Sequence, residues 1–418
     1  MAETTVLRKE YLERLIGWRE KAVIKVITGV RRCGKSTLLS QYMEYLRSSA
    51  VPDDRIVFVN LEDLEYRDLL TADSLYTYIK NRLSESAWTY VFIDEVQQCA
   101  EFERAVDSLF IQKNVDLYIT GSNAYMLSGE LATLLSGRYV ELSMLPLSFA
   151  EYAGFTGALK DGPAKAFGSY LGSGSFPYVA VLLSGFAGPR DALIRHYVRP
   201  YIEGIYNTIL VKDVAKREQI RDTAVLQDIV RFLCSAIGSP VSARNIANTL
   251  NSGGRKISVN TVEAYLGALR ESFIFYRISR FDIKGKEHLK TLGKYYIVDT
   301  GIRDLLLAAS SADLGHLLEN VICLELMRRG FKVNTGKVGE TEVDFVAQGP
   351  DGISYYQAAA SVLDPAVLER ELAPLRKIGD NHPKYLLTLD EYMNGANYDG
   401  IRQFNAVDWL LGNTHERP

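Results

Sequence analysis

Cysteine is scarce in this chain, and its spacing excludes two common kinds of site. The 418 residues include 4 cysteines, which stand far apart as Cys33, Cys99, Cys234 and Cys323. They form no C-x-x-C pair, so we expect neither a zinc site nor a disulfide framework. Scattered thiols of this kind fit a reducing interior.

Long apolar runs are also missing from the sequence. The N-terminal segment MAETTVLRKEYLERL is charged and lacks the apolar region of a signal peptide. The most apolar internal stretch, YVAVLLSGFAG from residue 178, is too short to span a bilayer. Hydrophobic residues make up 47% of the chain, charged residues 24%, and the formal net charge is −3. We therefore expect a soluble cytoplasmic protein of two or three domains, with no membrane partner.

A glycine-rich octet is the most informative feature that the chain does have. Residues 29–36 read GVRRCGKS, a complete G-x-x-x-x-G-K-[ST] phosphate loop. The octet follows the apolar run 23–28 and precedes the helix-forming segment 37–46. Its glycines let backbone N–H groups point into one concavity, and the positive end of the following helix faces the same place. The pattern therefore predicts a nucleotide phosphate site.

Individual residues of the loop have separate predicted roles. We expect Lys35 to reach the β- and γ-phosphates and Ser36 to hold Mg²⁺. Arg31 and Arg32 either touch phosphate or pack on adjacent acidic groups. The full set of predicted nucleotide contacts is Gly29, Arg31, Arg32, Cys33, Gly34, Lys35, Ser36 and Thr37.

Short apolar segments alternate with helical ones through residues 1–155. This alternation indicates an α/β fold with a parallel sheet, because buried parallel strands are nearly continuous in Val, Ile, Leu and aromatic residues. Apolar positions at helical spacing predict a helix over 101–113. The expected strands are 23–28, 56–61, 90–96, 116–122 and 139–145.

Two carboxylates stand together at the end of the third expected strand. The segment FIDEV puts Asp94 and Glu95 at the edge of the sheet where open α/β folds bind ligands. We expect Asp94 to hold Mg²⁺ through a water and Glu95 to act as general base on the attacking water. One expected strand separates this pair from the phosphate loop, which makes it a second nucleotide motif.

Polar residues also flank the fourth and fifth expected strands. Asn123 is the first choice for contacting the γ-phosphate and the attacking water, and Ser122 is the second. Ser122 is equally suited to cap the helix that follows. Arg138 either supplies transition-state charge, to its own site or to a neighbour's, or forms a surface salt bridge. Action on a neighbour's site would require a homo-oligomer.

These motifs together resemble the bacterial and archaeal AAA-type ATPases that carry a C-terminal domain of unknown function. The resemblance rests on TGVRRCGKSTLL, on FIDEVQQ and on the segment 120–152. It covers residues 1–155, the expected ATPase domain, and extends less sharply to the rest of the chain. It implies a P-loop ATPase sheet of order 5-1-4-3-2 with helices on both faces, and ATP with Mg²⁺ as the ligands.

The middle of the chain predicts two further regions. Residues 156–223 begin with a Gly- and Ser-rich stretch and are expected to form a helical lid or linker. In residues 224–295, expected helices at 242–251 and 258–275 precede a hairpin with a basic tip. That order of elements is the winged-helix arrangement.

The same segment, 224–295, is strongly basic. It contains eleven Lys and Arg against five Asp and Glu, an excess of six positive charges. This asymmetry is typical of a nucleic-acid-binding element, so double-stranded DNA is an expected partner. The alternative is a structural lid or an oligomer contact. The expected DNA contacts are Arg255, Asn260, Thr261, Lys284 and Lys286.

Residues 296–418 resemble the core of the restriction-endonuclease-like fold, which implies a vestigial Mg²⁺ site. The matching positions are Glu319 or Glu325 on a helix, Asp344 on a strand and Gln357 on the next strand. The family's lysine position is Ala359. We therefore expect a retained fold without catalysis that binds DNA or protein.

The motifs as a whole predict a Mg²⁺-dependent ATP hydrolase. Hydrolysis of ATP to ADP would drive a switch that the winged helix and residues 296–418 sense, and the switch would be coupled to duplex DNA or to a protein partner. Two alternatives stay open. One is a DNA-binding or scaffold protein that uses ATP as a structural ligand, and the other is a nuclease gated by ATP.

Overall fold

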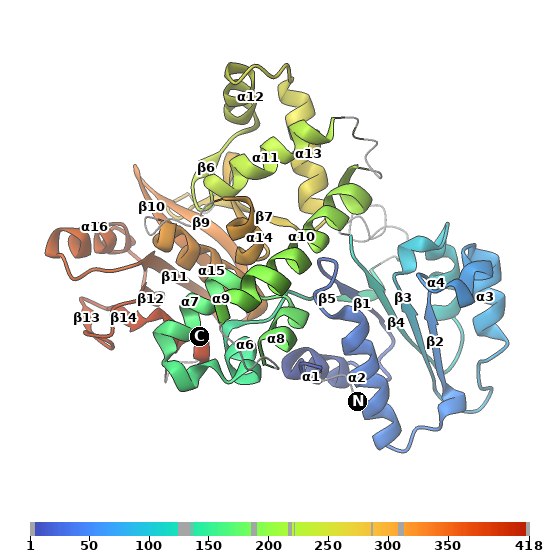
Figure 1. Ribbon diagram of the computed structural model, residues 1–418. Helices are drawn as coiled ribbons and strands as arrows, with labels where there is room; N and C mark the ends of the chain where they lie inside the picture. The colour runs from blue at the N-terminus through green and yellow to red at the C-terminus, as the bar shows by residue number, and fades with distance from the viewer. Residues whose placement is uncertain are drawn as a thin grey trace. The chain divides into compact units, whose positions relative to one another are not determined.

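The chain folds into two compact units (Figure 1). The N-terminal unit comprises Met1–Pro146 with Glu271–Phe273, and the C-terminal unit comprises Leu147–Arg270 with Ile274–Pro418. None of the helices formed by the described residues is long and apolar enough to cross a membrane. The structure, a computed structural model, describes residues 5–123, 135, 137–184, 190–215, 220, 222–285, 287–307 and 313–414.

A five-stranded parallel sheet forms the centre of the N-terminal unit. Its order is β2-β3-β4-β1-β5, which confirms the implied order 5-1-4-3-2. All the strands run in one direction, so the carboxyl ends of β1, β3 and β4 lie at the same edge of the sheet. The strands are β1 Ile24–Thr28, β2 Ile56–Asn60, β3 Thr89–Asp94, β4 Val115–Gly121 and β5 Tyr139–Ser143.

Helices follow the strands, as the alternating pattern predicted. The predicted helix over 101–113 is α4, which ends earlier than expected. Asn114, four residues after α4, adopts a left-handed φ of 59°, and β4 begins at the next residue. The helices of this unit are α1 Lys9–Gly17, α2 Lys35–Ser48, α3 Ala72–Lys80 and α4 Phe102–Phe110, with short 3₁₀ turns η1 Asp53–Arg55, η2 Leu64–Leu69 and η3 Val96–Gln98.

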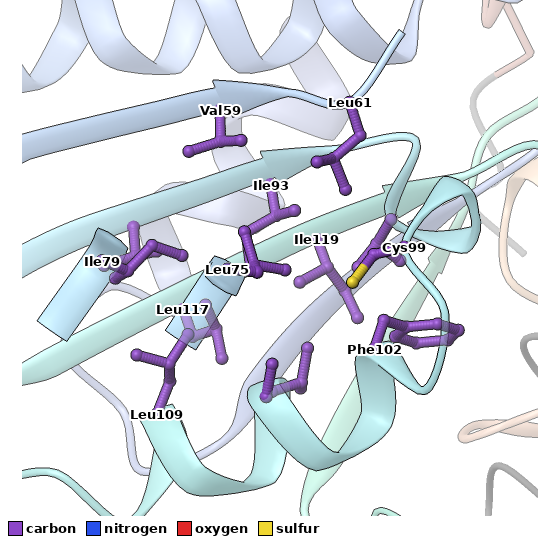
Figure 2. Packing of buried hydrophobic residues seen from close by; sticks show 14 of the residues in the cluster. Val59, Leu61, Leu75, Ile79, Ile93, Cys99, Phe102, Leu109, Leu117 and Ile119 are labelled. Atoms are coloured by element: carbon purple, nitrogen blue, oxygen red, sulfur yellow. The ribbon is translucent and has the colours of Figure 1, made fainter. Parts of the chain in front are cut away.

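An apolar core fixes one face of this sheet to its helices. Figure 2 shows side chains of β2, β3 and β4 meeting those of α3 and α4. Burying one such side chain contributes about 1.5–3 kcal/mol. The strands that carry Asp94 and Gly121 at their ends are therefore firmly held. Fully buried members of this core include Leu75, Ile93, Leu109 and Ile119.

The C-terminal unit begins with a helical region. The helical pattern of residues 190–218 is present from 190 to 215, where two π-helical segments, η6 Ile194–Val198 and η7 Ile209–Ala215, continue α9 and α10. The helices before the next strand are α6 Phe149–Thr156, α7 Pro163–Ser173, α8 Pro177–Ser184, α9 Arg190–Leu193, α10 Arg199–Thr208 and α11 Thr223–Ser235, with a 3₁₀ turn η5 Ala158–Asp161.

A nine-stranded mixed sheet runs through the rest of this unit, in the order β13-β14-β12-β11-β10-β9-β7-β8-β6. Leu372 and Leu375 of α16 pack in one apolar cluster with Val343 and Val346 of β10. The strands are β6 Pro240–Val241, β7 Phe275–Asp282, β8 Glu287–Ile297, β9 Lys332–Val338, β10 Thr341–Gly349, β11 Gly352–Ala359, β12 Lys384–Thr388, β13 Asn397–Tyr398 and β14 Ile401–Asn405. The helices are α12 Ala243–Ser252, α13 Val259–Glu271, α14 Thr300–Leu306, α15 Leu314–Arg328, α16 Pro365–Arg376 and α17 Ala406–Leu411.

The segment 224–295 has the expected order of helices and strands. α12 and α13 precede the antiparallel hairpin β7–β8, and the short strand β6 pairs antiparallel with β8. Ser242 and Ser258 accept hydrogen bonds from Asn245 N–H and Thr261 N–H at the starts of these helices. β7 also pairs in parallel with β9, so the hairpin belongs to the same sheet as the strands of residues 332–405.

Candidate functional site

The phosphate loop connects β1 to α2 at the carboxyl edge of the five-stranded sheet. A Cβ on Gly29 would lie 2.2 Å from the Met144 backbone oxygen, so only glycine fits this position. Gly34 is the N-cap of α2 with a left-handed φ of 105°, a conformation that glycine adopts without strain. The loop therefore leads the chain directly to a helix N-terminus, where N–H groups are free to bind an anion.

Lys35 is the buried cation of this site. Its Nζ donates to the Gly29 carbonyl at 3.0 Å and lies 3.5 Å from Glu95 Oε1. The side chain is only 3% exposed. Lys35 therefore bridges the phosphate loop and the end of β3, which are the two predicted nucleotide motifs.

Asp94 ends β3 with its carboxylate facing α2 and β4. Its Oδ1 accepts a hydrogen bond from Thr120 Oγ1 at 2.5 Å, and the Ser36 side chain also lowers the pKa of this carboxyl. Burial raises the pKa of the Asp94 carboxyl, and these two side chains offset that rise only in part. Ser36 itself is exposed. A serine hydroxyl beside a carboxylate is a set of hard oxygen donors, which suits Mg²⁺.

Glu95 adopts a left-handed φ of 52°, which starts the turn η3. Its N–H donates to Thr120 Oγ1 at 2.9 Å, and its Oε2 accepts from Ser122 Oγ at 2.9 Å. Burial favours the protonated acid, but Lys35 and the hydrogen bond from Gln97 outweigh it and lower the pKa of Glu95. The carboxylate is therefore ionised at neutral pH.

Of the two candidates after β4, the structure brings Ser122 into contact with Glu95. Asn123, the first choice, is the next residue and is buried. The helix that Ser122 was alternatively expected to cap falls on residues 124–134, which lie outside the described part of the chain.

The three arginines predicted near the nucleotide have different surroundings. Arg31 pairs with Glu62 at 2.7 Å, as one alternative had it. Arg32 is exposed with a left-handed φ of 68°. Arg138 lies 3.4 Å from Asp107 with both side chains more than 40% exposed, the surface salt bridge that the sequence left open.

Two further loop residues complete the predicted nucleotide contacts. Cys33 is buried, which raises the pKa of its thiol, and its carbonyl accepts from Arg8 Nη1 at 2.9 Å. Thr37 is half-buried in the first turn of α2. Arg8 also donates to the Leu145 carbonyl at 2.8 Å, so it ties the phosphate loop to the chain after β5.

Sequence reasoning missed three residues that shape this site. Thr120 links Asp94 and Glu95 through one hydroxyl, and Gln97 binds the Glu95 carboxylate. Gln97 stands within the quoted motif FIDEVQQ, and Thr120 begins the quoted segment 120–152, so their membership of these motifs was the available signal. Nothing in the sequence around Arg8 marked it as a partner of the loop.

The expected DNA contacts have different surroundings, and Arg255 is both exposed and paired. Asn260 and Lys284 are exposed. Arg255 pairs with Asp228 at 2.7 Å. The Thr261 hydroxyl lies 2.8 Å from Ser258 Oγ in the capping turn of α13. Lys286 lies outside the described residues.

A buried charge cluster occupies the implied nuclease positions of the C-terminal unit. Lys294 of β8 is 4% exposed, and its Nζ lies 2.9 Å from Glu319, 2.9 Å from Glu342 and 3.4 Å from Asp344. Burial opposes the charged form of Lys294, but these carboxylates outweigh it and raise its pKa. Burial and the neighbouring Glu319 raise the pKa of Asp344 to about 7.

The remaining nuclease positions are engaged in other contacts. Glu325 pairs with Arg328 and Arg329, so Glu319 is the helix carboxylate of the cluster. Gln357 accepts from Asp344 N–H at 3.2 Å and donates to Glu371 at 2.8 Å. The sequence counted Lys294 among the basic residues of a DNA surface, whereas the structure buries it.

Comparisons with known proteins find matches to both the N-terminal and the later part of the chain. A family model described as an AAA domain matches residues 21–153, and one described as a domain of unknown function (DUF8612) matches residues 174–313. An uncharacterized protein of Haemophilus influenzae is 37% identical over 417 residues, which cover 98% of this chain and 100% of that protein. An uncharacterized protein of Methanocaldococcus jannaschii is 29% identical over 339 residues, or 78% of this chain and 72% of that protein.

Among solved structures, a Walker-type ATPase of Pyrococcus abyssi has a similar fold. The TM-score is 0.53 at 17% sequence identity, and the match covers 73% of this chain and 97% of that one. The likeness at this identity concerns the fold alone. The sheet order, the phosphate loop and the match over nearly the whole length of a relative lead to one conclusion. The chain belongs to the family of AAA-type P-loop ATPases that carry a C-terminal domain of unknown function.

Proposed function

We propose that the protein hydrolyses Mg·ATP and that hydrolysis drives a switch coupled to duplex DNA. The observation that carries the proposal is the meeting of Lys35 and Glu95 at 3.5 Å, beside the Ser36–Asp94 pair. A phosphate-binding cation, a divalent-cation site and an ionised base then share one edge of the sheet. Phosphoryl transfer requires these three elements together.

Each side chain has a defined task in this proposal. The N–H groups of the phosphate loop and the N-terminus of α2 bind the phosphates, and Lys35 turns from Glu95 toward their oxygens. Ser36 and Asp94 would hold Mg²⁺, which supplies positive charge against the charge that develops on the phosphate oxygens. Glu95, ionised and buried, accepts the proton of the attacking water or orients it.

The coupled partner is proposed to bind through residues 224–295, taken as a winged helix. The order α11, β6, α12, α13, β7, β8 supports this proposal, as do the exposed Asn260 and Lys284. Two basic residues of the segment, Arg255 and Lys294, are paired with carboxylates of the chain itself. Asp228 is already counted in the excess of six, whereas the partners of Lys294 lie outside the segment, so the pairing of Lys294 makes the excess available to DNA smaller than the composition suggests.

Residues 296–418 are proposed to bind DNA or protein and not to cleave DNA. Lys294 places an ammonium group among the carboxylates that a divalent cation would otherwise need. The Gln357 amide is already engaged by Asp344 N–H and Glu371. Ala359 supplies no amine to orient a water. These contacts support a retained fold with no nuclease activity.

Phosphate release by the full chain tests the proposed coupling. The rate should require Mg²⁺ and should rise when duplex DNA is added. A rate that DNA leaves unchanged and a protein partner raises would place the coupling with that partner. ATP binding with no turnover, in either the presence or absence of DNA, would contradict the proposal and favour the scaffold alternative.

Removing the Lys284 side chain should weaken DNA binding without disturbing the hairpin. Lys284 N–H and Gly285 N–H both donate to Asp282 Oδ1, so the Asp282 carboxylate holds the turn without the Lys284 side chain. Each lost phosphate contact reduces the slope of log K against log salt by about 0.9. We expect that change for Lys284→Ala, measured by fluorescence anisotropy of a labelled duplex across salt concentrations. Lys377→Ala, at an exposed lysine after α16, is the matched control. Equal slopes in the two variants would favour a structural lid.

A further inference from the structure

The Glu95 carboxylate is held by an amide two residues further along the chain. Gln97 Nε2 lies 2.5 Å from Glu95 Oε2 and 3.2 Å from Ser122 Oγ. Ser122 Oγ in turn lies 2.9 Å from Glu95 Oε2. Gln97 and Ser122 therefore hold one carboxylate oxygen from two sides, while the other oxygen, Oε1, faces Lys35.

Backbone geometry brings these two side chains together. Glu95 takes a left-handed φ of 52°, and the chain then enters the turn η3, whose Gln98 N–H donates to the Glu95 carbonyl at 3.0 Å. A non-glycine residue in this conformation is strained and persists only where its surroundings hold it. The tight turn folds Gln97 back onto the carboxylate that precedes it.

The orientation of the Gln97 amide is determined by its neighbours. A carboxylate only accepts hydrogen bonds, so the NH₂ group must face Glu95. In this orientation Gln97 Oε1 is buried and has no hydrogen-bond partner among the described residues. A buried polar atom without a partner is unfavourable, so the contact with Glu95 forms although it leaves the amide oxygen unsatisfied.

We propose that Gln97 is a positioning residue, which fixes the Glu95 carboxylate for its work on the attacking water. The role rests on the proposed function of Glu95 as base. Gln97 matters most once Lys35 has left Glu95 Oε1 for the nucleotide phosphates. Gln97 and Ser122 then still hold the carboxylate through Oε2. Loss of the Gln97 amide lets the carboxylate rotate, which lowers the turnover number and leaves ATP affinity unchanged.

A double-mutant cycle tests this role. Gln97→Met keeps the length of the side chain and removes the donor. Because the lost hydrogen bond is to a charged group, we expect Gln97→Met to lower the rate of single-turnover hydrolysis by about 10- to 100-fold. The same substitution in the Glu95→Gln background should have almost no further effect, because no carboxylate is left to position. Gln98→Met, at the exposed neighbour, should match the wild type.

The outcomes separate this inference from the proposed function. Equal losses from Gln97→Met in the wild-type and Glu95→Gln backgrounds would mean a structural role and would overturn it. Wild-type turnover by Gln97→Met, together with an inactive Glu95→Gln variant, would also overturn the positioning role of Gln97. The proposed role of Glu95 as base would then still stand. Full turnover by Glu95→Gln would overturn both. Nucleotide affinity, measured on every variant, should be no weaker than that of the wild type.

Discussion

Replacing Glu95 by glutamine is expected to lower ATP turnover by about 10²- to 10⁴-fold, the usual contribution of a general base. The amide keeps the size of the side chain but cannot take a proton. Lys35 also loses the carboxylate that lies 3.5 Å away, so ATP should bind at least as tightly as to the wild type. Phosphate release gives the rate, and titration of a fluorescent ATP analogue gives the affinity.

Glu101→Gln provides a matched control for this substitution. Glu101 lies before α4 with its side chain 62% exposed and pairs with Arg104 on the surface. The same chemical change there should leave turnover within a factor of about two, since exposed pairs contribute little. Turnover by Glu95→Gln at the rate of this control would mean that another group activates the water.

The second large effect is expected in the C-terminal unit, on stability. Lys294→Met removes the ammonium that faces Glu319, Glu342 and Asp344. Removing one partner of a buried ion pair costs about 3–5 kcal/mol, because the remaining charges stay buried and uncompensated. The unfolding transition of this unit should therefore move to clearly lower denaturant.

Tryptophan fluorescence can report on this unit alone. Trp18 and Trp88 lie in the N-terminal unit, whereas Trp409 is buried in the C-terminal unit. Phenylalanine at the first two positions leaves Trp409 as the single probe in the full chain. Lys332→Met, at an exposed lysine of β9, should change the midpoint little. An equally small change for Lys294→Met would contradict the buried-cation description.

The Lys294 variant has a rescue that a packing defect would not show. Neutralising Glu319 in the same chain, as Lys294→Met with Glu319→Gln, removes one of the uncompensated charges. Part of the lost stability should return, because the two side chains are in contact and their effects are coupled. Purely additive losses would indicate that Lys294 acts through its aliphatic stem.

The N-terminal sheet could be predicted because its signals are local. Strands such as β1 and β3 are short apolar runs bounded by polar turns, and the phosphate loop lies between a strand and a helix. The strand order could not be predicted from this local pattern. It came from the resemblance to a known family. Pairing between strands depends on contacts that periodicity along one strand does not encode.

The contact of Ser122 with Glu95 depends on a turn that the sequence does not reveal, while the nucleotide contacts of Ser122 and Asn123 stay predictions. Both follow β4, and the backbone direction after Gly121 decides which side chain meets Glu95. Arg138 was left open for the same reason, because its partner Asp107 belongs to α4. The local sequence pattern identified the edge of the sheet where the site lies, but not which side chains from different elements contact each other there.

Lys294 shows a limit of composition as a guide. A lysine in a basic hairpin reads as a surface charge, and its burial depends on carboxylates from α15 and β10 that come later in the chain. The pairing of β7 with β9 could not be predicted for the same reason, because β9 lies beyond the expected domain boundary at residue 295. Both are tertiary effects that override a local signal.

Phosphate release from Mg·ATP by the wild type and by Lys35→Ala, measured side by side, tests the central claim most directly. Lys21→Ala, at an exposed lysine before β1, serves as the control. We predict turnover by the wild type and the control, and none above the protein-free background for Lys35→Ala, whose ATP affinity should also be lost. Wild-type turnover by Lys35→Ala would contradict the assignment of the phosphate loop as the catalytic nucleotide site.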